Sequence, residues 1–109
     1  MTEYITLGTV ADVPLGTVRR FDVDGLAIAV AHTEMGFFAL EDRCSHADVA
    51  LSEGELEGCL LECWLHGSAF DVRTGEPQSL PAITSVRTYS VTADPSTPDS
   101  PIHISLETE

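Results

Sequence analysis

Basic residues are scarce in this chain of 109 residues. Lysine and arginine together number 5, against 18 aspartates and glutamates, and the formal net charge is −13. Nucleic acids and anionic lipid surfaces are polyanions, so a surface of this charge disfavours both as partners. It favours a protein partner with a basic docking face, and it also serves solubility.

Long hydrophobic runs are absent as well. The longest, Leu26 to Ala31, is strand-sized and far too short to span a bilayer. No basic segment followed by an apolar run stands near Met1, so we expect no signal peptide, no membrane association and a cytoplasmic location. At this length we expect a single domain over residues 1–109 and no separate substrate domain.

The cysteines number 3, which is odd, whereas a secreted disulfide scaffold normally carries an even set. A reducing compartment and metal-bound thiolates fit this number better. The chain also shows no activated nucleophile and no mononuclear iron triad. We therefore expect it not to transform a substrate on its own.

Helical periodicity is missing too, and the hydrophobic pattern predicts β structure throughout. The predicted strands cover residues 18–23, 26–30, 36–40, 69–72, 86–91 and 102–106, with a further hairpin around residue 58. Asp24-Gly25 predicts a tight hairpin turn. Residues 94–101 hold three prolines, which exclude a central strand and predict an exposed loop. The fold class is therefore an antiparallel all-β sandwich or small barrel with its ligand loops at one end.

Two short clusters carry the chemistry: Cys44-Ser45-His46 and Cys63-Trp64-Leu65-His66, with sixteen residues between His46 and Cys63. Each cluster offers one thiolate and one imidazole, so the four ligands form matched pairs. A [2Fe–2S] cluster with two cysteines on one iron and two histidines on the other needs such a set. Gly67 follows His66 and allows the backbone to turn sharply beside the site.

A single structural zinc is the main alternative, because two cysteines and two histidines are an ordinary zinc set. The common zinc pattern, however, pairs cysteine with cysteine and histidine with histidine. Here each pair is mixed and Cys-x-His is tight for one tetrahedral ion, so the spacing favours an iron–sulfur cluster. A second alternative, that all four residues are ordinary buried side chains, fits poorly with their arrangement in two short motifs.

The pattern Cys-Ser-His, sixteen residues, then Cys-Trp-Leu-His-Gly resembles the Rieske iron–sulfur signature. The resemblance extends over nearly the whole chain and includes Asp12-Val13-Pro14, Val23-Asp24-Gly25, Phe70-Asp71, Thr74-Gly75-Glu76 and Leu80-Pro81-Ala82. The sequence is similar to the bacterial Rieske-type ferredoxins that serve ring-hydroxylating dioxygenases. The resemblance implies the Rieske β-fold, with a cluster-binding part over about residues 42–82.

The resemblance also implies a role for each ligand. Cys44 and Cys63 would bind the inner iron of the [2Fe–2S] cluster as thiolates. His46 and His66 would bind the outer iron and lie near the molecular surface. Pro81 matches the loop that covers the cluster from a third side in this family.

Departures from the respiratory members of the family predict a low reduction potential. Val49 and Leu65 stand where those proteins carry a pair of disulfide-forming cysteines, so that disulfide cannot form here. Ser68 and Phe70 match the serine and tyrosine whose hydroxyls donate hydrogen bonds toward the cluster sulfurs, and phenylalanine has no donor. Fewer donors stabilise the reduced cluster less, which predicts the lower part of the Rieske range of about −150 to +300 mV.

The implied function is one-electron transfer from a flavin-dependent ferredoxin reductase to a terminal oxygenase. We expect a monomer that forms weak, transient complexes with both. Three alternatives remain open at this stage: a small electron-transfer subunit of another oxidoreductase such as a nitrite reductase, a redox sensor or accessory of iron–sulfur assembly, and a structural zinc module.

The remaining notable side chains favour ordinary roles. Cys59 lies in an apolar run and is predicted to be a buried thiol. His32 and His103 lie in strands and are predicted to be structural or surface histidines. Trp64 fits either a docking surface or packing beside the cluster. The glutamates between the ligand pairs are predicted to form a solvated face, and the alternative is that they steer a basic partner toward the cluster; they are Glu53, Glu55, Glu57 and Glu62.

Overall fold

The computed structural model of the chain describes residues 4–23, 25–43, 50–64, 68–78, 85–94 and 96–108. Its elements, in chain order, are β1 (Tyr4–Thr9), the 3₁₀ helix η1 (Val10–Asp12), β2 (Val18–Val23), β3 (Leu26–Thr33), β4 (Gly36–Glu41), the 3₁₀ helix η2 (Leu51–Glu53), β5 (Leu56–Glu57), β6 (Leu60–Glu62), β7 (Ala69–Asp71), β8 (Thr88–Thr92) and β9 (Pro101–Thr108). Among these residues, no helix has the length and hydrophobicity needed to cross a membrane.

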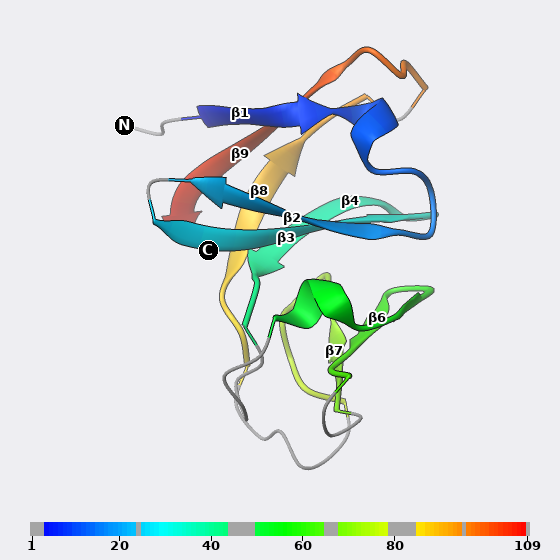
Figure 1. The fold of residues 1–109 in the computed structure, drawn as a ribbon, viewed down its shortest axis with the longest axis vertical. Helices are drawn as coiled ribbons and strands as arrows, with labels where there is room; N and C mark the ends of the chain where they lie inside the picture. Colours follow the sequence, from blue (N-terminus) through cyan, green and yellow to red (C-terminus); the bar gives the residue numbers. More distant parts are fainter. Residues whose placement is uncertain are drawn as a thin grey trace.

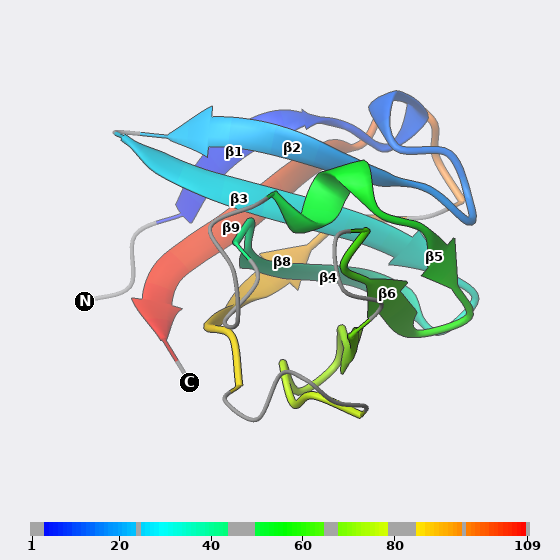
Figure 2. The same ribbon diagram turned by 60° about the horizontal axis from the view of Figure 1, so that its bottom comes forward.

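The larger sheet has six strands in the order β1-β9-β8-β4-β3-β2, and every pair in it is antiparallel. The sheet curls strongly, so that β1 and β2, its two outer strands, approach each other in a barrel-like arrangement (Figures 1 and 2). The smaller sheet has three strands in the order β5-β6-β7. The predicted antiparallel all-β class is confirmed.

The smaller sheet is an excursion of the chain: a segment inserted in sequence between two neighbouring strands of the larger sheet. β4 and β8 are hydrogen-bonded neighbours, with Ala39 opposite Tyr89 and Leu40 opposite Thr88. The chain between them leaves the large sheet after β4, forms η2 and β5–β7, and returns to β8 (Figure 1). In sequence, both predicted ligand pairs fall between β4 and β8, and the cluster-binding part over about residues 42–82 stays a prediction.

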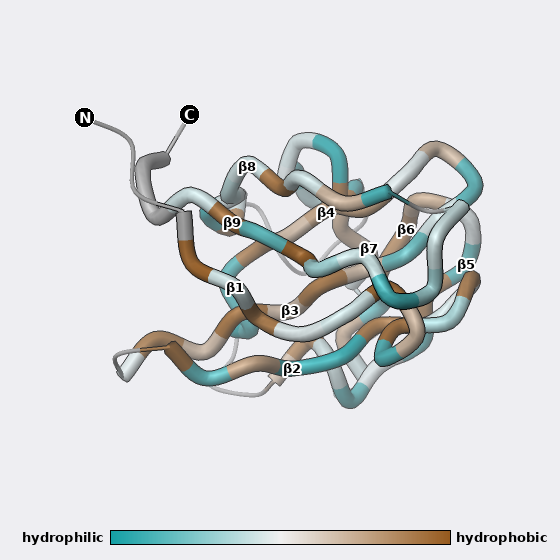
Figure 3. Tube along the Cα trace, turned by 90° about the horizontal axis from the view of Figure 1, so that it is seen from above, coloured by the Kyte–Doolittle hydropathy of each residue, from teal (hydrophilic) through white to brown (hydrophobic). Residues whose placement is uncertain are grey.

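β3 is buried on both faces, and its two faces serve two different cores. Ile28 and Val30 point into the first core, inside the curled sheet. Ala29 and Ala31 belong to the second core, together with buried residues of η2 and the small sheet. Figure 3 shows β3 as a largely hydrophobic strand, in contrast to the mixed colouring of β2. The alanines explain how the second layer packs here, since small side chains let a neighbouring layer approach closely.

Most strand predictions are confirmed within a residue or two. Gly25 has φ +84° and Gly58 has φ +62°, as tight hairpins require. β8 starts later than predicted, because the Val86 N–H donates to the Gly75 carbonyl at 2.8 Å and not to a sheet neighbour. β1 was not predicted, because its pairing with β9 contains an irregularity between Thr6 and Gly8 that breaks the alternation.

The proline-containing loop is exposed, as predicted, and it also supports η1. The Val10 N–H donates to the Ser100 carbonyl at 2.9 Å, and the Ala11 N–H donates to the Pro98 carbonyl at 3.0 Å. Pro101, the third proline of the predicted loop, is the first residue of β9. A strand start tolerates proline, because the missing N–H is needed only further along the ladder.

Candidate metal centre

Of the four predicted ligands, the structure describes Cys63. Cys44, His46 and His66 lie outside the described residues, so their assignment remains a prediction. The same is true of three other residues to which the resemblance gives a meaning: Val49, Leu65 and Pro81. What the structure does describe is how the ends of these segments are held.

Cys63 lies directly after β6 on the inner face of the small sheet. Its side chain is fully buried in the second core, beside Leu61 and Phe70. Its N–H donates to the Ser68 carbonyl at 2.6 Å, which continues the β6–β7 pairing by one step. This bond joins the described residues on the two sides of residues 65–67.

Ser68, directly before β7, and Phe70, within β7, are the two residues that the resemblance relates to hydrogen bonding toward the cluster. Both side chains are fully buried. Phe70 lies opposite Leu61 across the β6–β7 pair, and its ring offers no hydrogen-bond donor. Ser68 supplies a buried hydroxyl close in sequence to both members of the second ligand pair. The structure thus retains the features behind the low-potential prediction, which itself stays untested.

Asp42, which the sequence analysis did not single out, fastens the segment of the first ligand pair. Its side chain has no exposed surface. Oδ1 accepts a hydrogen bond from the Ser52 N–H at 2.7 Å, and Oδ2 accepts one from the Ser52 hydroxyl at 2.6 Å. Arg20 of β2 stands 3.9 Å from Oδ2. Because Asp42 and Ser52 lie on either side of residues 44–49, these bonds hold the two ends of that segment together.

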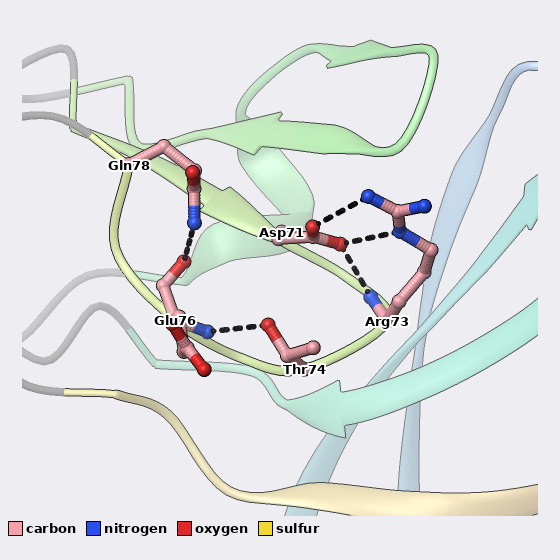
Figure 4. Close-up of polar contacts among 5 residues, drawn as sticks. All are labelled: Asp71, Arg73, Thr74, Glu76 and Gln78. Carbon is pink, nitrogen blue, oxygen red and sulfur yellow. Dashed lines mark hydrogen bonds and ion pairs between the residues drawn. The ribbon is translucent and has the colours of Figure 1, made fainter.

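A compact turn after β7 leads toward the third segment, residues 79–84. The Arg73 guanidinium donates to both oxygens of Asp71, at 3.0 and 2.8 Å, and the Arg73 N–H adds a bond of 2.9 Å (Figure 4). The hydrogen bonds from Arg73 lower the pKa of the Asp71 carboxyl below its ordinary value, and Asp71 in turn raises the pKa of Arg73.

The end of this turn is tied back to β7. The Gln78 N–H donates to the Ala69 carbonyl at 2.7 Å, and the Gln78 side-chain amide donates to the Glu76 carbonyl at 3.2 Å (Figure 4). The Val86 N–H bonds to Gly75 on the far side of residues 79–84. All three segments that the motif and the resemblance assign to the site therefore start and end on anchored backbone.

The donor set fits a mixed-ligand iron–sulfur cluster. A fully buried cysteine in an apolar core is suited to bind as a thiolate whose charge a metal neutralises. Two thiolates, two sulfides, two ferric ions and two neutral imidazoles sum to a charge near zero, which such a core tolerates. In the described part of the chain, no three side chains of histidine, cysteine, aspartate or glutamate gather into a competing metal site.

The other residues of interest take the following places. His32 is buried, with Nδ1 at 2.8 Å from the Val13 carbonyl and its ring stacked on Phe37 at 4.0 Å. His103 forms a hydrogen bond with the Thr6 hydroxyl at 3.0 Å. His32 is a buried structural histidine and His103 lies half-buried in β9, which agrees with the predicted structural or surface roles. Trp64, left open by the sequence, is 52% exposed and lies on the surface.

The prediction for Cys59 was wrong, because the thiol is only partly buried. It follows Gly58 at the tip of the β5–β6 hairpin, where one side of the residue meets the second core and the other faces outward. The glutamates between the ligand pairs are all exposed, as predicted for a solvated face; they are Glu53, Glu55, Glu57 and Glu62. Their steering role stays a prediction.

Comparison with known proteins agrees with this geometry. A family model described as the Rieske [2Fe-2S] domain matches residues 3–90. The ferredoxin component of biphenyl 2,3-dioxygenase from Rhodococcus jostii (strain RHA1) is 46% identical over 80 residues, covering 73% of this chain and 75% of the relative.

Solved structures agree as well. The ferredoxin of carbazole 1,9a-dioxygenase from Nocardioides aromaticivorans IC177 superimposes with a TM-score of 0.86 at 32% identity, covering 95% of this chain and 98% of that one. A ferredoxin solved in complex with the reduced oxygenase of carbazole 1,9a-dioxygenase gives a TM-score of 0.86 at 32% identity, covering 97% of this chain and 95% of that chain.

Proposed function

Because the chain belongs to the Rieske [2Fe–2S] family and is a ferredoxin within it, we propose that it carries single electrons from a flavin-dependent reductase to the terminal oxygenase of a ring-hydroxylating dioxygenase system. Its cofactor is one Rieske-type [2Fe–2S] cluster. We assign Cys44 and Cys63 to the inner iron and His46 and His66 to the outer iron. The cluster supplies reversible one-electron chemistry when bound.

The burial of Cys63 is the observation that carries this assignment. Its side chain is enclosed by the second core, and its backbone is pinned to Ser68. Such a thiolate is screened from water and oxidants, as the inner ligand of an electron carrier needs to be. As ligands, His46 and His66 would bind in the neutral form and keep a second ring N–H that could donate a hydrogen bond, which suits the iron that meets a partner.

The partners and the location follow from the same reasoning. The oxygenase is supported by a relative of 32% identity that was solved as an oxygenase–ferredoxin complex. The reductase is inferred, because a one-electron carrier needs a donor. A strongly acidic carrier that meets both in turn is best served by weak, fast complexes and a monomeric state. The reduced thiolates that the site needs favour a cytoplasmic location.

Anaerobic purification with visible absorption and electron paramagnetic resonance of the reduced protein tests the ligand set. Mixed cysteine–histidine ligation gives a lower average g value than four cysteines. Cys63→Ser should abolish or alter the signal, whereas Cys59→Ser should leave it unchanged. His46→Ala should abolish it and His103→Ala should not. A colourless protein that holds one zinc would refute the assignment.

Transfer to the oxygenase is tested separately. The dithionite-reduced protein is mixed with the oxidised oxygenase component of the Rhodococcus jostii biphenyl dioxygenase, whose own ferredoxin is 46% identical to this chain. We expect reoxidation of the ferredoxin in step with reduction of the oxygenase. Stable co-purification with a large reductase subunit in place of such turnover would favour a permanent subunit of another oxidoreductase.

A further inference from the structure

The outer face of the small sheet is amphipathic, and its β6 positions are exposed to solvent. Along the β6 segment the burial alternates residue by residue: Leu61 and Cys63 are fully buried, whereas Leu60, Glu62 and Trp64 are exposed. Successive side chains of a strand point to opposite faces, so Leu60 and Glu62 of β6 share the outer face. Trp64 stands two residues beyond Glu62, in the turn after the strand, and the alternation of burial continues to it.

The strand register adds the neighbours of this face. Glu57 of β5 lies opposite Leu60, and it is exposed as well. On the other side, Ala69 of β7 lies opposite Glu62 and Asp71 lies opposite Leu60. Opposite residues of an antiparallel pair point to the same side. We call this set the outer face: Glu57, Leu60, Glu62, Trp64, Ala69 and Asp71.

The charges on the outer face are not equivalent. Asp71 is engaged by Arg73 in a two-bond ion pair, so its charge is compensated within the turn (Figure 4). Glu57 and Glu62 appear in no ion pair that the described structure contains, and both are exposed. The outer face therefore presents two uncompensated carboxylates beside its hydrophobic residues.

Trp64 and Leu60 are unusual in their exposure. Trp64 is 52% exposed, whereas Phe70 and Tyr89 are buried, and every other phenylalanine is at least half-buried. Among aromatic side chains whose burial the structure describes, Trp64 is thus the one on the surface. Leu60, 41% exposed, lies in β6, four residues before Trp64. Exposed tryptophan is a favoured anchor of protein interfaces, because it combines a large apolar area with few rotatable bonds.

We propose that the outer face is a docking surface for the electron-transfer partner. The partner is a protein with an apolar recess that receives Trp64 and Leu60 of this chain. Basic side chains around that recess lie against Glu57 and Glu62. The proposal rests on the proposed function and extends the contact area from the ligand loops onto the sheet. Charge complementarity selects a basic partner, and Trp64 is covalently adjacent to the predicted ligand Cys63, so the outer face begins beside a predicted ligand.

The test uses cytochrome c, a basic haem protein with lysines around its haem edge, as the electron acceptor. The dithionite-reduced holoprotein is mixed with oxidised cytochrome c by stopped flow at low ionic strength, and the second-order rate constant is measured. The face variants are Leu60→Ala, Glu57→Gln and Trp64→Ala. Leu26→Ala is the matched control for leucine, because Leu26 is 37% exposed and lies on the β2–β3 hairpin. Asp99→Asn is the control for charge, because Asp99 is exposed in the proline-containing loop.

We expect Leu60→Ala and Glu57→Gln each to lower the rate constant about threefold or more, and Trp64→Ala about tenfold or more. The controls should stay within about twofold of the wild type. Raising the ionic strength to about 0.3 M should remove the difference between Glu57→Gln and the wild type, but not the effect of Leu60→Ala. The midpoint potential and the paramagnetic resonance spectrum of each variant show that the cluster is intact.

Two outcomes separate this proposal from the proposed function. If the face variants react with cytochrome c as fast as the controls do, the outer face is not a docking surface, whatever the oxygenase experiment gives. If they slow that reaction while the wild type fails to reduce the biphenyl oxygenase component, the docking surface stands and the oxygenase partner falls. Concentration-dependent dimerisation that Trp64→Ala abolishes would assign the face to a second copy of the chain and overturn the proposal.

Discussion

Replacement of Asp42 by alanine should loosen the segment that carries the first ligand pair. Its buried carboxylate accepts hydrogen bonds of 2.7 and 2.6 Å from the N–H and the hydroxyl of Ser52. A hydrogen bond to a charged group contributes roughly 1.5–3 kcal/mol, and part of that is recovered when water replaces the carboxylate. We therefore expect Asp42→Ala to lower the free energy of unfolding by about 2–4 kcal/mol.

Ser52 offers a graded version of the same perturbation. Ser52→Ala removes the hydroxyl bond and leaves the N–H bond, so its cost should be about 1–2 kcal/mol. The double variant should cost less than the sum of the two single variants, because both remove one shared interaction. Additive costs would mean that the two residues stabilise the protein independently.

The assay must separate the loosening of the site from a general loss of stability. Ile102→Ala is the control, since Ile102 is fully buried in the first core, inside the curled sheet, and should cost about 2–5 kcal/mol. Cluster loss is followed as bleaching of the visible absorption in the presence of an iron chelator, well below the melting temperature. When the two variants are compared at conditions that give them the same free energy of unfolding, Asp42→Ala should lose its cluster several times faster than Ile102→Ala. Equal rates would refute the idea that Asp42 positions the ligand segment.

Three further predictions follow from the other anchors. Gly75→Ala should cost about 2 kcal/mol or more in urea unfolding, because Gly75 has φ +80° and an added Cβ would collide with the Val86 carbonyl oxygen. Because the pKa of Asp71 is lowered in the folded protein, the ionised carboxylate stabilises the fold above its ordinary pKa, and this stabilisation is lost as the pH falls through the lowered value. Asp71→Asn should therefore flatten the decline of the free energy of unfolding below about pH 4, measured in a series of urea titrations. Ser68→Ala should lower the midpoint potential in protein-film voltammetry, and an unchanged midpoint would show that the hydroxyl does not reach the cluster.

The hairpins were predictable because their signals are local. Gly25 and Gly58 each stand between two hydrophobic stretches, and a tight turn needs such a residue. β1 escaped prediction because its partner, β9, lies at the other end of the sequence, with Tyr4 opposite Ser105. Its stability comes from that distant pairing and from burial, so its own residues give only a weak pattern.

The same distinction applies to the site. Each ligand pair is a motif of three or four residues, and the chemistry of its side chains is readable without a fold. The contact between Asp42 and Ser52 spans ten residues and depends on a carboxylate being enclosed, which no local pattern reveals. Cys59 failed for a related reason: its apolar neighbours predicted burial, but the turn at Gly58 puts it at the rim of the core.

The position of the site follows from how the two sheets share β3. Large and small side chains alternate along β3, so that Ile28 and Val30 pack in the first core and Ala29 and Ala31 pack in the second. Cys63 belongs to that second core, so the packing that attaches the small sheet also places a predicted ligand. Because β4 and β8 are neighbours, the excursion between them begins and ends at one place on the large sheet. The backbone on either side of the ligand segments is therefore held by the same contacts that fold the protein.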